Sequence, residues 1–190
     1  MIFGDLAGTV EVFAKAPNRS RVLVEMDGSA LGIGRIVSDQ RFDGTSGYVL
    51  DSVTGDREIT GSQLDTLRNG YFPTPLLDYR DKGFTLELTG KETIGPRTSY
   101  ALRLTPKSGP PIRLYVDAES FLMLRTATTV NVPELGGDLD QVVDFSDYRE
   151  VDGIPLPRSV RSTNPAQTIT AVLTDVKHNV EIEDASFARP

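Results

Sequence analysis

The sequence predicts a mainly β protein made of about ten or eleven short antiparallel strands and one short helix. Three observations predict this: apolar and polar residues alternate in most segments, turn-forming residues separate these segments, and helical spacing of apolar residues is convincing once. The segment 84–89 is the clearest strand, because Phe84, Leu86 and Leu88 fall on one side and the polar residues on the other. Similar alternation predicts strands at 10–14, 22–26, 100–105, 112–116, 141–148, 168–173 and 176–182.

The dipeptide Asp152-Gly153 predicts a two-residue hairpin turn between strands at 143–151 and 154–160. Such a turn needs positive φ angles, which glycine adopts without a steric penalty and aspartate tolerates. Ser108-Gly109-Pro110 and Asp27-Gly28 mark looser turns between other strand-like runs. These connections favour strands that pair with their neighbours in the chain.

The one predicted helix covers residues 62–69. Ser62 is placed to cap it, and Asp65 follows three residues on, as in a capping box. Two prolines soon after the helix prevent its continuation, because proline lacks the amide proton and its ring clashes with the preceding turn. The apolar residues that share one face of this segment are Leu64, Leu67 and Tyr71.

This pattern leaves open what covers the apolar side of the strands. Many strands with a single short helix must close into a barrel, stack as a sandwich, or curl around the helix. A curled sheet leaves a concave apolar cavity, the usual setting for lipid-like ligands. A sandwich with a filled core is the alternative that periodicity alone does not exclude.

Length and composition limit the possible functions. The chain has 190 residues, the size of one domain, so we expect a single domain over 1–190. Its net charge of -7, without a basic run, excludes nucleic acid as an expected partner. It has no cysteine, so disulfides and thiolate metal sites are impossible. No apolar run has the length of a membrane span, and we therefore expect a soluble protein that does not cross the membrane.

Catalytic patterns are weak, and we expect no enzymatic activity, metal or cofactor. His178 is the single histidine, and alternation puts it on the apolar side of the strand predicted at 176–182. The turn Gly44-Thr45-Ser46-Gly47 lacks the strand-to-helix context of a nucleophile elbow. Asp138 and Asp140 lack the further oxygen ligands of a calcium loop, so a solvated loop is the expected reading.

Several segments together resemble a known family of bacterial envelope proteins. The matching segments are KAPNR at 15–19, FDG at 42–44, GYVLD at 47–51, YVDAE at 115–119, DYREVDGIPLP at 147–157 and VKHNVEIEDASFARP at 176–190. They resemble the outer-membrane lipoprotein-sorting family, the LolA/LolB-like carriers and receptors. The resemblance covers nearly the whole chain, although its motifs are turn and strand-edge signals.

The resemblance implies a strongly curved antiparallel sheet that forms an unclosed half-barrel with a short helical lid. It also implies a periplasmic or cell-envelope location, with an export signal and an upstream helix expected to be missing from this sequence. Family members carry the acyl chains of lipoproteins in an apolar cavity without chemistry. The implied function is binding or carriage of a lipid, acyl chain or lipoprotein.

The expected partners are therefore a lipid or an acylated protein, and an envelope protein is a further candidate. The alternative is a structural or protein-interaction module of a larger envelope protein, with a core filled by its own side chains. For the lipid carrier, the candidate lid and cavity residues are Leu64, Leu67, Tyr71, Phe72, Phe84, Leu86, Leu88, Leu102 and Leu114.

Overall fold

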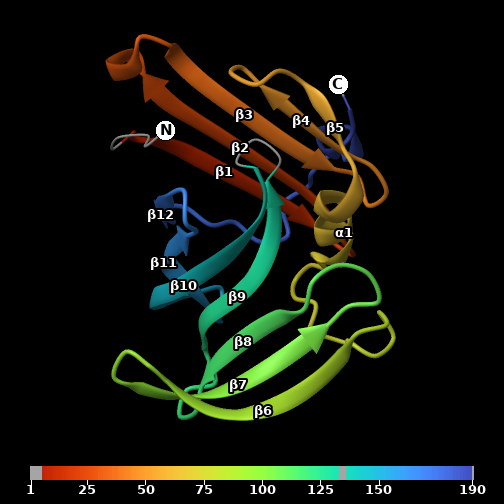
Figure 1. The fold of residues 1–190 in the computed structure, drawn as a ribbon, viewed down its shortest axis with the longest axis vertical. Coiled ribbons are helices and arrows are strands. Elements are labelled where there is room, and N and C mark those ends of the chain that lie inside the picture. The colour runs from red at the N-terminus through yellow and green to blue at the C-terminus, as the bar shows by residue number, and fades with distance from the viewer. Residues whose placement is uncertain (1–5, 133–135, 190) are drawn as a thin grey trace. The chain divides into compact units, whose positions relative to one another are not determined.

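The protein is mainly β, as predicted. A computed structural model describes residues 6–132 and 136–189, with 56% of the chain in strands and 8% in helix. The described residues form two antiparallel sheets of five and seven strands, neither closed into a barrel, and one α-helix (Figure 1). The described strands number twelve, slightly more than the expected ten or eleven. The predicted open antiparallel architecture with a short helix is confirmed.

The chain divides into two compact units, and each is described by itself. Unit 1 comprises Met1–Leu77 and Glu181–Pro190, and unit 2 comprises Asp78–Val180. The prediction of a single domain over 1–190 stays a prediction.

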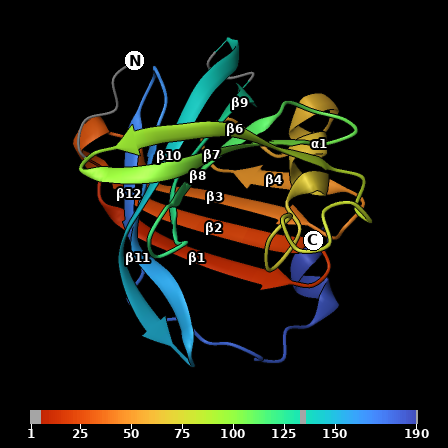
Figure 2. The same cartoon turned by 90° about the horizontal axis from the view of Figure 1, so that it is seen from below.

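Unit 1 contains a five-stranded meander in the order β1-β2-β3-β4-β5, and Figure 2 shows β1 to β4 side by side. Its strands are β1 (Gly8–Lys15), β2 (Arg19–Gly28), β3 (Gly34–Phe42), β4 (Gly47–Asp51) and β5 (Arg57–Ile59). The 3-10 turn η1 (Ser29–Leu31) joins β2 to β3, and the helix α1 (Gly61–Asn69) follows β5. A second 3-10 turn, η3 (Asp184–Phe187), returns from the C-terminal segment and packs against β2 and β3.

The two faces of this sheet differ in chemistry. The register pairs Ser20 with Phe42, Phe42 with Gly47, and Gly47 with Ile59, so these residues share one face. Phe42 and Ile59 are fully buried there. The opposite face carries Lys15, Arg21, Asp39 and Arg41. Lys15 and Arg19 form ion pairs with Asp184 of η3, and Lys15 Nζ donates a hydrogen bond to the Ile182 carbonyl, which precedes η3.

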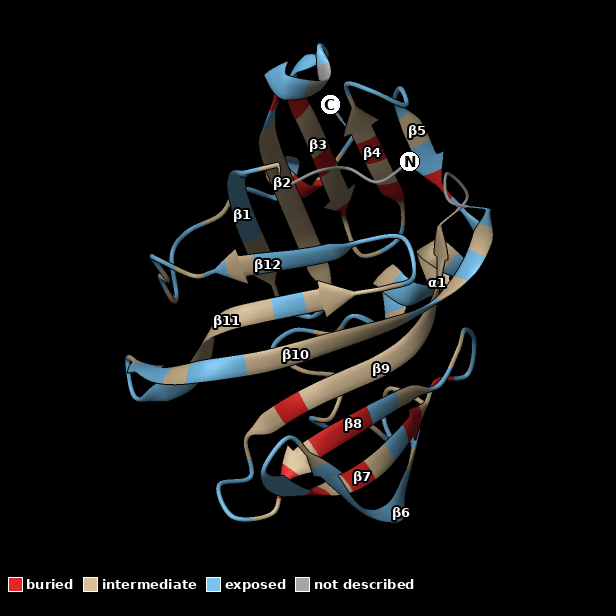
Figure 3. Cartoon of the chain, turned by 60° about the vertical axis from the view of Figure 1, so that its left-hand side comes forward, coloured by how far each residue is buried: buried red, intermediate tan, exposed pale blue. Residues whose placement is uncertain are grey.

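Unit 2 contains a seven-stranded sheet in the order β12-β11-β10-β9-β8-β7-β6 (Figure 3). Strands that are adjacent in this sheet are also consecutive in the chain, so the sheet is a simple meander. The strands are β6 (Thr85–Ile94), β7 (Arg97–Thr105), β8 (Ile112–Asp117), β9 (Met123–Val132), β10 (Gly137–Val151), β11 (Ile154–Thr163) and β12 (Thr168–Val172).

The hairpin predicted at Asp152-Gly153 is confirmed. Val151 pairs with Ile154, and the two residues between them have φ angles of 51° and 79°. Both angles are positive, as a two-residue turn between twisted strands requires. The predicted helix is confirmed too, since α1 covers Gly61–Asn69.

Three details differ from the prediction. The N-cap of α1 is Thr60 rather than Ser62, and no side chain caps the helix. The segment 176–182 forms no strand, and its burial follows the alternation only in part, since Val176, His178 and Ile182 are half-buried but Val180 is 50% exposed. Alternation in a sequence does not guarantee a partner strand for the backbone.

Candidate functional site

A row of leucines crosses three neighbouring strands of unit 2. Leu88 of β6 pairs directly with Leu102 of β7, which pairs with Leu114 of β8. Directly paired residues project from the same face of a sheet, with Cβ atoms roughly 5 Å apart. We call Leu88, Leu102 and Leu114 the leucine row.

A second apolar row lies beside the first. Leu86 pairs with Leu104, and Leu104 pairs with Ile112. These residues are two positions along each strand from the leucine row, so they share its face. The structure therefore brings four predicted site residues, Leu86, Leu88, Leu102 and Leu114, together on one sheet face.

Burial changes steeply along the leucine row. Leu114 is only 4% exposed, whereas Leu88 at the edge strand is 61% exposed. Figure 3 shows the same trend, with buried residues on β7 and β8 and a largely exposed β6. The row is thus a continuous apolar strip with one end in the core and the other open to solvent. Predicted site residue Phe84 precedes β6, is buried, and donates its backbone N–H to the Tyr79 carbonyl at 2.8 Å.

The predicted lid residues lie in unit 1. Leu64 and Leu67 are on α1 and are half-buried. Leu67 packs on the sheet of its own unit, because a Cβ added at Gly47 would lie 2.9 Å from Leu67 Cδ1. Tyr71 is half-buried and Phe72 is exposed just beyond the helix, where the Phe72 N–H donates to the Pro17 carbonyl at 2.8 Å. The lid residues and the leucine row thus belong to different units.

The open end of the leucine row carries an aromatic pair. Tyr100 of β7 and Phe121 stack with ring centroids 6.5 Å apart and an interplanar angle of 7°. Phe121 is 70% exposed and has a φ angle of 59°, a left-handed conformation that is unusual for a bulky residue. Lys91 of β6 pairs with Tyr100, and its ammonium lies 5.1 Å from the centre of the tyrosine ring.

The turn that presents Phe121 is held by Asp117. Its carboxylate accepts hydrogen bonds from the backbone N–H groups of Glu119 and Ser120, at 2.8 and 3.0 Å, and from Arg97 Nη1 at 3.0 Å. The backbone donors, followed by Arg97, lower the pKa of Asp117 to about 2. A charged carboxylate at neutral pH therefore fixes the turn.

Sequence reasoning missed Lys91 as part of this face. Simple alternation from Leu86 and Leu88 would place Gly90 and Glu92 beside them. The ladder shifts by one residue between Leu88 and Gly90, which leaves Thr89 unpaired. The isolated glycine was the available signal, because a glycine within a strand often marks a bulge.

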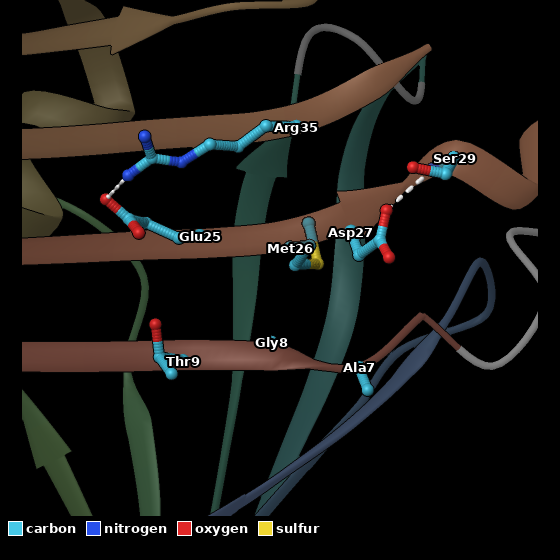
Figure 4. A pocket seen from close by; sticks show the side chains of 8 residues that line it. All are labelled: Ala7, Gly8, Thr9, Glu25, Met26, Asp27, Ser29 and Arg35. Carbon is cyan, nitrogen blue, oxygen red and sulfur yellow. Dashed lines mark hydrogen bonds and ion pairs between the residues drawn. The ribbon is translucent and has the colours of Figure 1, made fainter. Parts of the chain in front are cut away.

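A pocket of about 410 Å³ lies among the ends of β1, β2 and β3 (Figure 4). Its lining residues are Ala7, Gly8, Thr9, Glu25, Met26, Asp27, Ser29 and Arg35. Glu25 and Arg35 form an ion pair, and the pKa of Asp27 is lowered by hydrogen bonds from Ser29. This mixed polar lining does not suit an acyl chain, and the pocket includes none of the predicted site residues.

The residues considered for chemistry belong to both units. His178 Nδ1 lies 3.0 Å from Asp152 Oδ2 in unit 2, whereas Ser46 is in the β3–β4 turn of unit 1. Asp138 and Asp140 lie in β10 and not in a loop, which corrects the expectation. Asn131 and Thr129 of β9 donate hydrogen bonds to them, at 2.7 and 3.1 Å. Over residues 6–132 and 136–189, no group of three potential metal ligands comes together.

Among the described residues, no helix has both the length and the apolar character needed to cross a membrane.

The fold is that of a mainly β protein with two open antiparallel sheets and one helix. No protein-family model matches the chain, and no curated protein matches it. Similar folds are found among solved structures, three of which align with nearly the whole of this chain. A LolA superfamily protein from Nitrosomonas europaea aligns over 98% of this chain and 84% of its own, with 16% sequence identity and a TM-score of 0.60.

An outer membrane lipoprotein-sorting protein domain from Vibrio parahaemolyticus aligns over 96% of this chain and 81% of its own, with 13% identity and a TM-score of 0.55. A DUF1329 family protein from Desulfovibrio piger covers the same shares, with 19% identity and a TM-score of 0.54. The chain therefore has a LolA-like fold, which confirms the fold expected from the sequence resemblance.

Proposed function

We propose that this protein binds and carries a lipid, an acyl chain or the acyl group of a lipoprotein, without catalysing a reaction. The observation that carries the proposal is the leucine row, an apolar strip that runs from the buried Leu114 to the exposed Leu88. A linear hydrocarbon chain laid along such a strip gains about 0.8 kcal/mol for each buried methylene group. The LolA-like fold supports the same conclusion.

The proposed location is the bacterial periplasm or cell envelope. The name of the similar structure from Vibrio parahaemolyticus, an outer membrane lipoprotein-sorting protein domain, supports this location. The proposed partners are a lipid or an acylated protein, together with an envelope protein that delivers or receives it. The acidic net charge of -7 disfavours nucleic acid.

The test is displacement of N-phenyl-1-naphthylamine, a neutral dye that fluoresces in apolar sites, by dodecan-1-ol. Leu88→Glu places a charge in the open end of the leucine row and should weaken dodecan-1-ol binding at least tenfold. Because Leu88 is already exposed, folding should survive, which circular dichroism checks.

Val172→Glu is the matched control. Val172 is 64% exposed, on the same sheet, but it pairs with Ser159 and lies on the face opposite the leucine row. Its replacement should leave binding unchanged. Equal effects of the two substitutions, or no displacement by the folded wild-type protein, would contradict the proposal.

We further propose that α1 and the segment after it are a lid element that contributes Leu64, Leu67, Tyr71 and Phe72 to ligand binding. Phe72 offers the cleaner test, because Leu67 also packs against its own sheet. Phe72→Ala should reduce dodecan-1-ol binding, whereas Leu77→Ala, an exposed apolar residue of the same unit, should not. Unchanged binding by Phe72→Ala would remove the lid from the proposal.

A second candidate, a protein-interaction module, is favoured by the edge strand β1. Val10 and Val12 are exposed on this strand, whose pairing in the sheet is with β2 alone. Exposed apolar edge strands are templates for pairing with another chain. A binding partner whose capture survives Leu88→Glu but not Val12→Lys would favour this candidate over lipid carriage.

A further inference from the structure

Lys91 projects from the apolar face of the seven-stranded sheet because of the bulge in β6. With Thr89 unpaired, Lys91 pairs with Tyr100, and Tyr100 pairs with Val116. Tyr100 lies two residues from Leu102 along β7, so this row is the immediate neighbour of the leucine row, roughly 7 Å away. Bulges commonly redirect a side chain from one face of a sheet to the other.

This lysine stands out among its neighbours. Within the described strands β6 to β9, the register gives the same face as Lys91 only uncharged side chains, among them Leu86, Thr98 and Thr126. The opposite face of the same strands carries Glu87, Glu92, Arg97, Arg103, Arg113, Asp117 and Arg125. Within the described strands β6 to β9, Lys91 is therefore the one charged residue on this face, whose reverse side is highly charged.

The ammonium group of Lys91 has capacity for a ligand. Lys91 is exposed, and it forms no ion pair with any carboxylate in residues 6–132 or 136–189. Its cation–π contact with Tyr100 attracts the charge but does not neutralise it. An ammonium group has three N–H donors, and the face of the Tyr100 ring leaves at least some of them able to bond a ligand.

We propose that the preferred ligand is a single-chain, long-chain carboxylate, with its hydrocarbon chain along the leucine row and its head group paired with Lys91. This inference rests on the proposed function. The charge on the face matches a head group with one negative charge, because β6 to β9 supply no second cation there. The stacked pair of the half-buried Tyr100 and the exposed Phe121 beside Lys91 gives the first carbons of the chain an apolar surface.

The experiment compares dodecanoate with dodecan-1-ol, which have the same chain length, as competitors of N-phenyl-1-naphthylamine at low ionic strength. Lys91→Met should weaken dodecanoate binding about threefold to fivefold, the effect typical of an exposed ion pair, and leave dodecan-1-ol binding unchanged. Lys91→Arg should retain dodecanoate binding. Added salt should weaken dodecanoate binding to the wild type and leave that of Lys91→Met unaffected.

Lys177→Met is the matched control, since Lys177 is an exposed lysine of the same unit that pairs with Asp175 and lies outside the strands that carry the leucine row. It should bind both ligands as the wild type does. Equal binding of dodecanoate by the wild type and Lys91→Met would overturn this inference while dodecan-1-ol binding still supports lipid carriage. Failure of both ligands to bind the folded wild type would overturn the inference and the proposed function together.

Discussion

Arg21 and Asp39 form a two-point ion pair, in which Arg21 Nε lies 2.8 Å from Asp39 Oδ1 and Arg21 Nη2 lies 2.8 Å from Oδ2. Arg41 Nη2 also lies 2.8 Å from Oδ2, so one buried carboxylate serves two guanidinium groups. Burial by itself would raise the pKa of Asp39, but the hydrogen bonds from Arg21 and Arg41 lower it overall. The pair connects β2 and β3 beneath η3.

Replacing this carboxylate should destabilise the protein. Asp39→Asn leaves two partly buried guanidinium groups without their counter-charge, and we expect a loss of about 1–3 kcal/mol in the free energy of unfolding. Asp144→Asn is the comparison, because the Arg125–Asp144 pair is more exposed and its loss should cost less than about 1 kcal/mol. Urea unfolding measures the loss of stability in both variants. Equal losses would contradict the larger stabilising role given to Asp39.

The low pKa of Asp117 predicts a pH dependence of stability. Because the folded pKa is about 2 and the ordinary value is 3.8, the stabilisation is fully present above about pH 5 and is lost as the pH falls toward 2. The stability difference between wild type and Asp117→Asn should therefore be largest at neutral pH and shrink in acid. Glu119→Gln, in the same turn, is the control. A difference that does not vary with pH would refute the role of the charge.

Close packing between Gly47 and Leu67 predicts a coupled pair of substitutions. A Cβ at position 47 would lie 2.9 Å from Leu67 Cδ1 and 3.1 Å from Ile59 Cβ, so Gly47→Ala should cost about 1–3 kcal/mol. Leu67→Ala removes the nearer obstacle, and the double variant should lose less stability than the sum of the single variants. Thermal and urea unfolding of the four proteins test this, and simple additivity would show that α1 does not pack there.

The hairpin turn of unit 2 predicts a backbone effect at Gly153, whose φ angle is 79°. Gly153→Ala should destabilise the protein by about 1 kcal/mol, since a Cβ is disfavoured in this conformation. Gly153→Asn should cost less, because asparagine tolerates positive φ. No residue lies close enough to clash with a Cβ at this position, so a larger loss would point to a cause other than the backbone.

Local signals in the sequence predicted local structure well. The hairpin at Asp152-Gly153 follows from residues that act on their own backbone, so no distant contact was needed to infer it. The helix predicted at 62–69 was found from its apolar spacing and the prolines after it, whereas the cap predicted at Ser62 was wrong. The apolar alternation of Leu86 and Leu88 likewise placed them on one face. These are features in which a few neighbouring residues determine the conformation.

Features that depend on pairing between strands were less accessible. The alternation at 176–182 resembles a strand, but its backbone enters no ladder. The bulge at Thr89 depends on the register of β6 against β7, and it alone decides that Lys91 faces the leucines. The LolA-like resemblance predicted the fold, whereas the arrangement of charge on that face depends on strand register and could be seen only in the structure.

Thr89 has no partner residue in the β6–β7 ladder. The charge on the leucine-row face therefore depends on the register between these two strands and not on their amino-acid composition. The same ten residues of β6, paired without the bulge, would turn Lys91 to the opposite face and bring the acidic Glu92 among the leucines. Related chains can thus exchange a surface that attracts anions for one that repels them by gaining or losing one irregularity, with every amino acid of the strand unchanged.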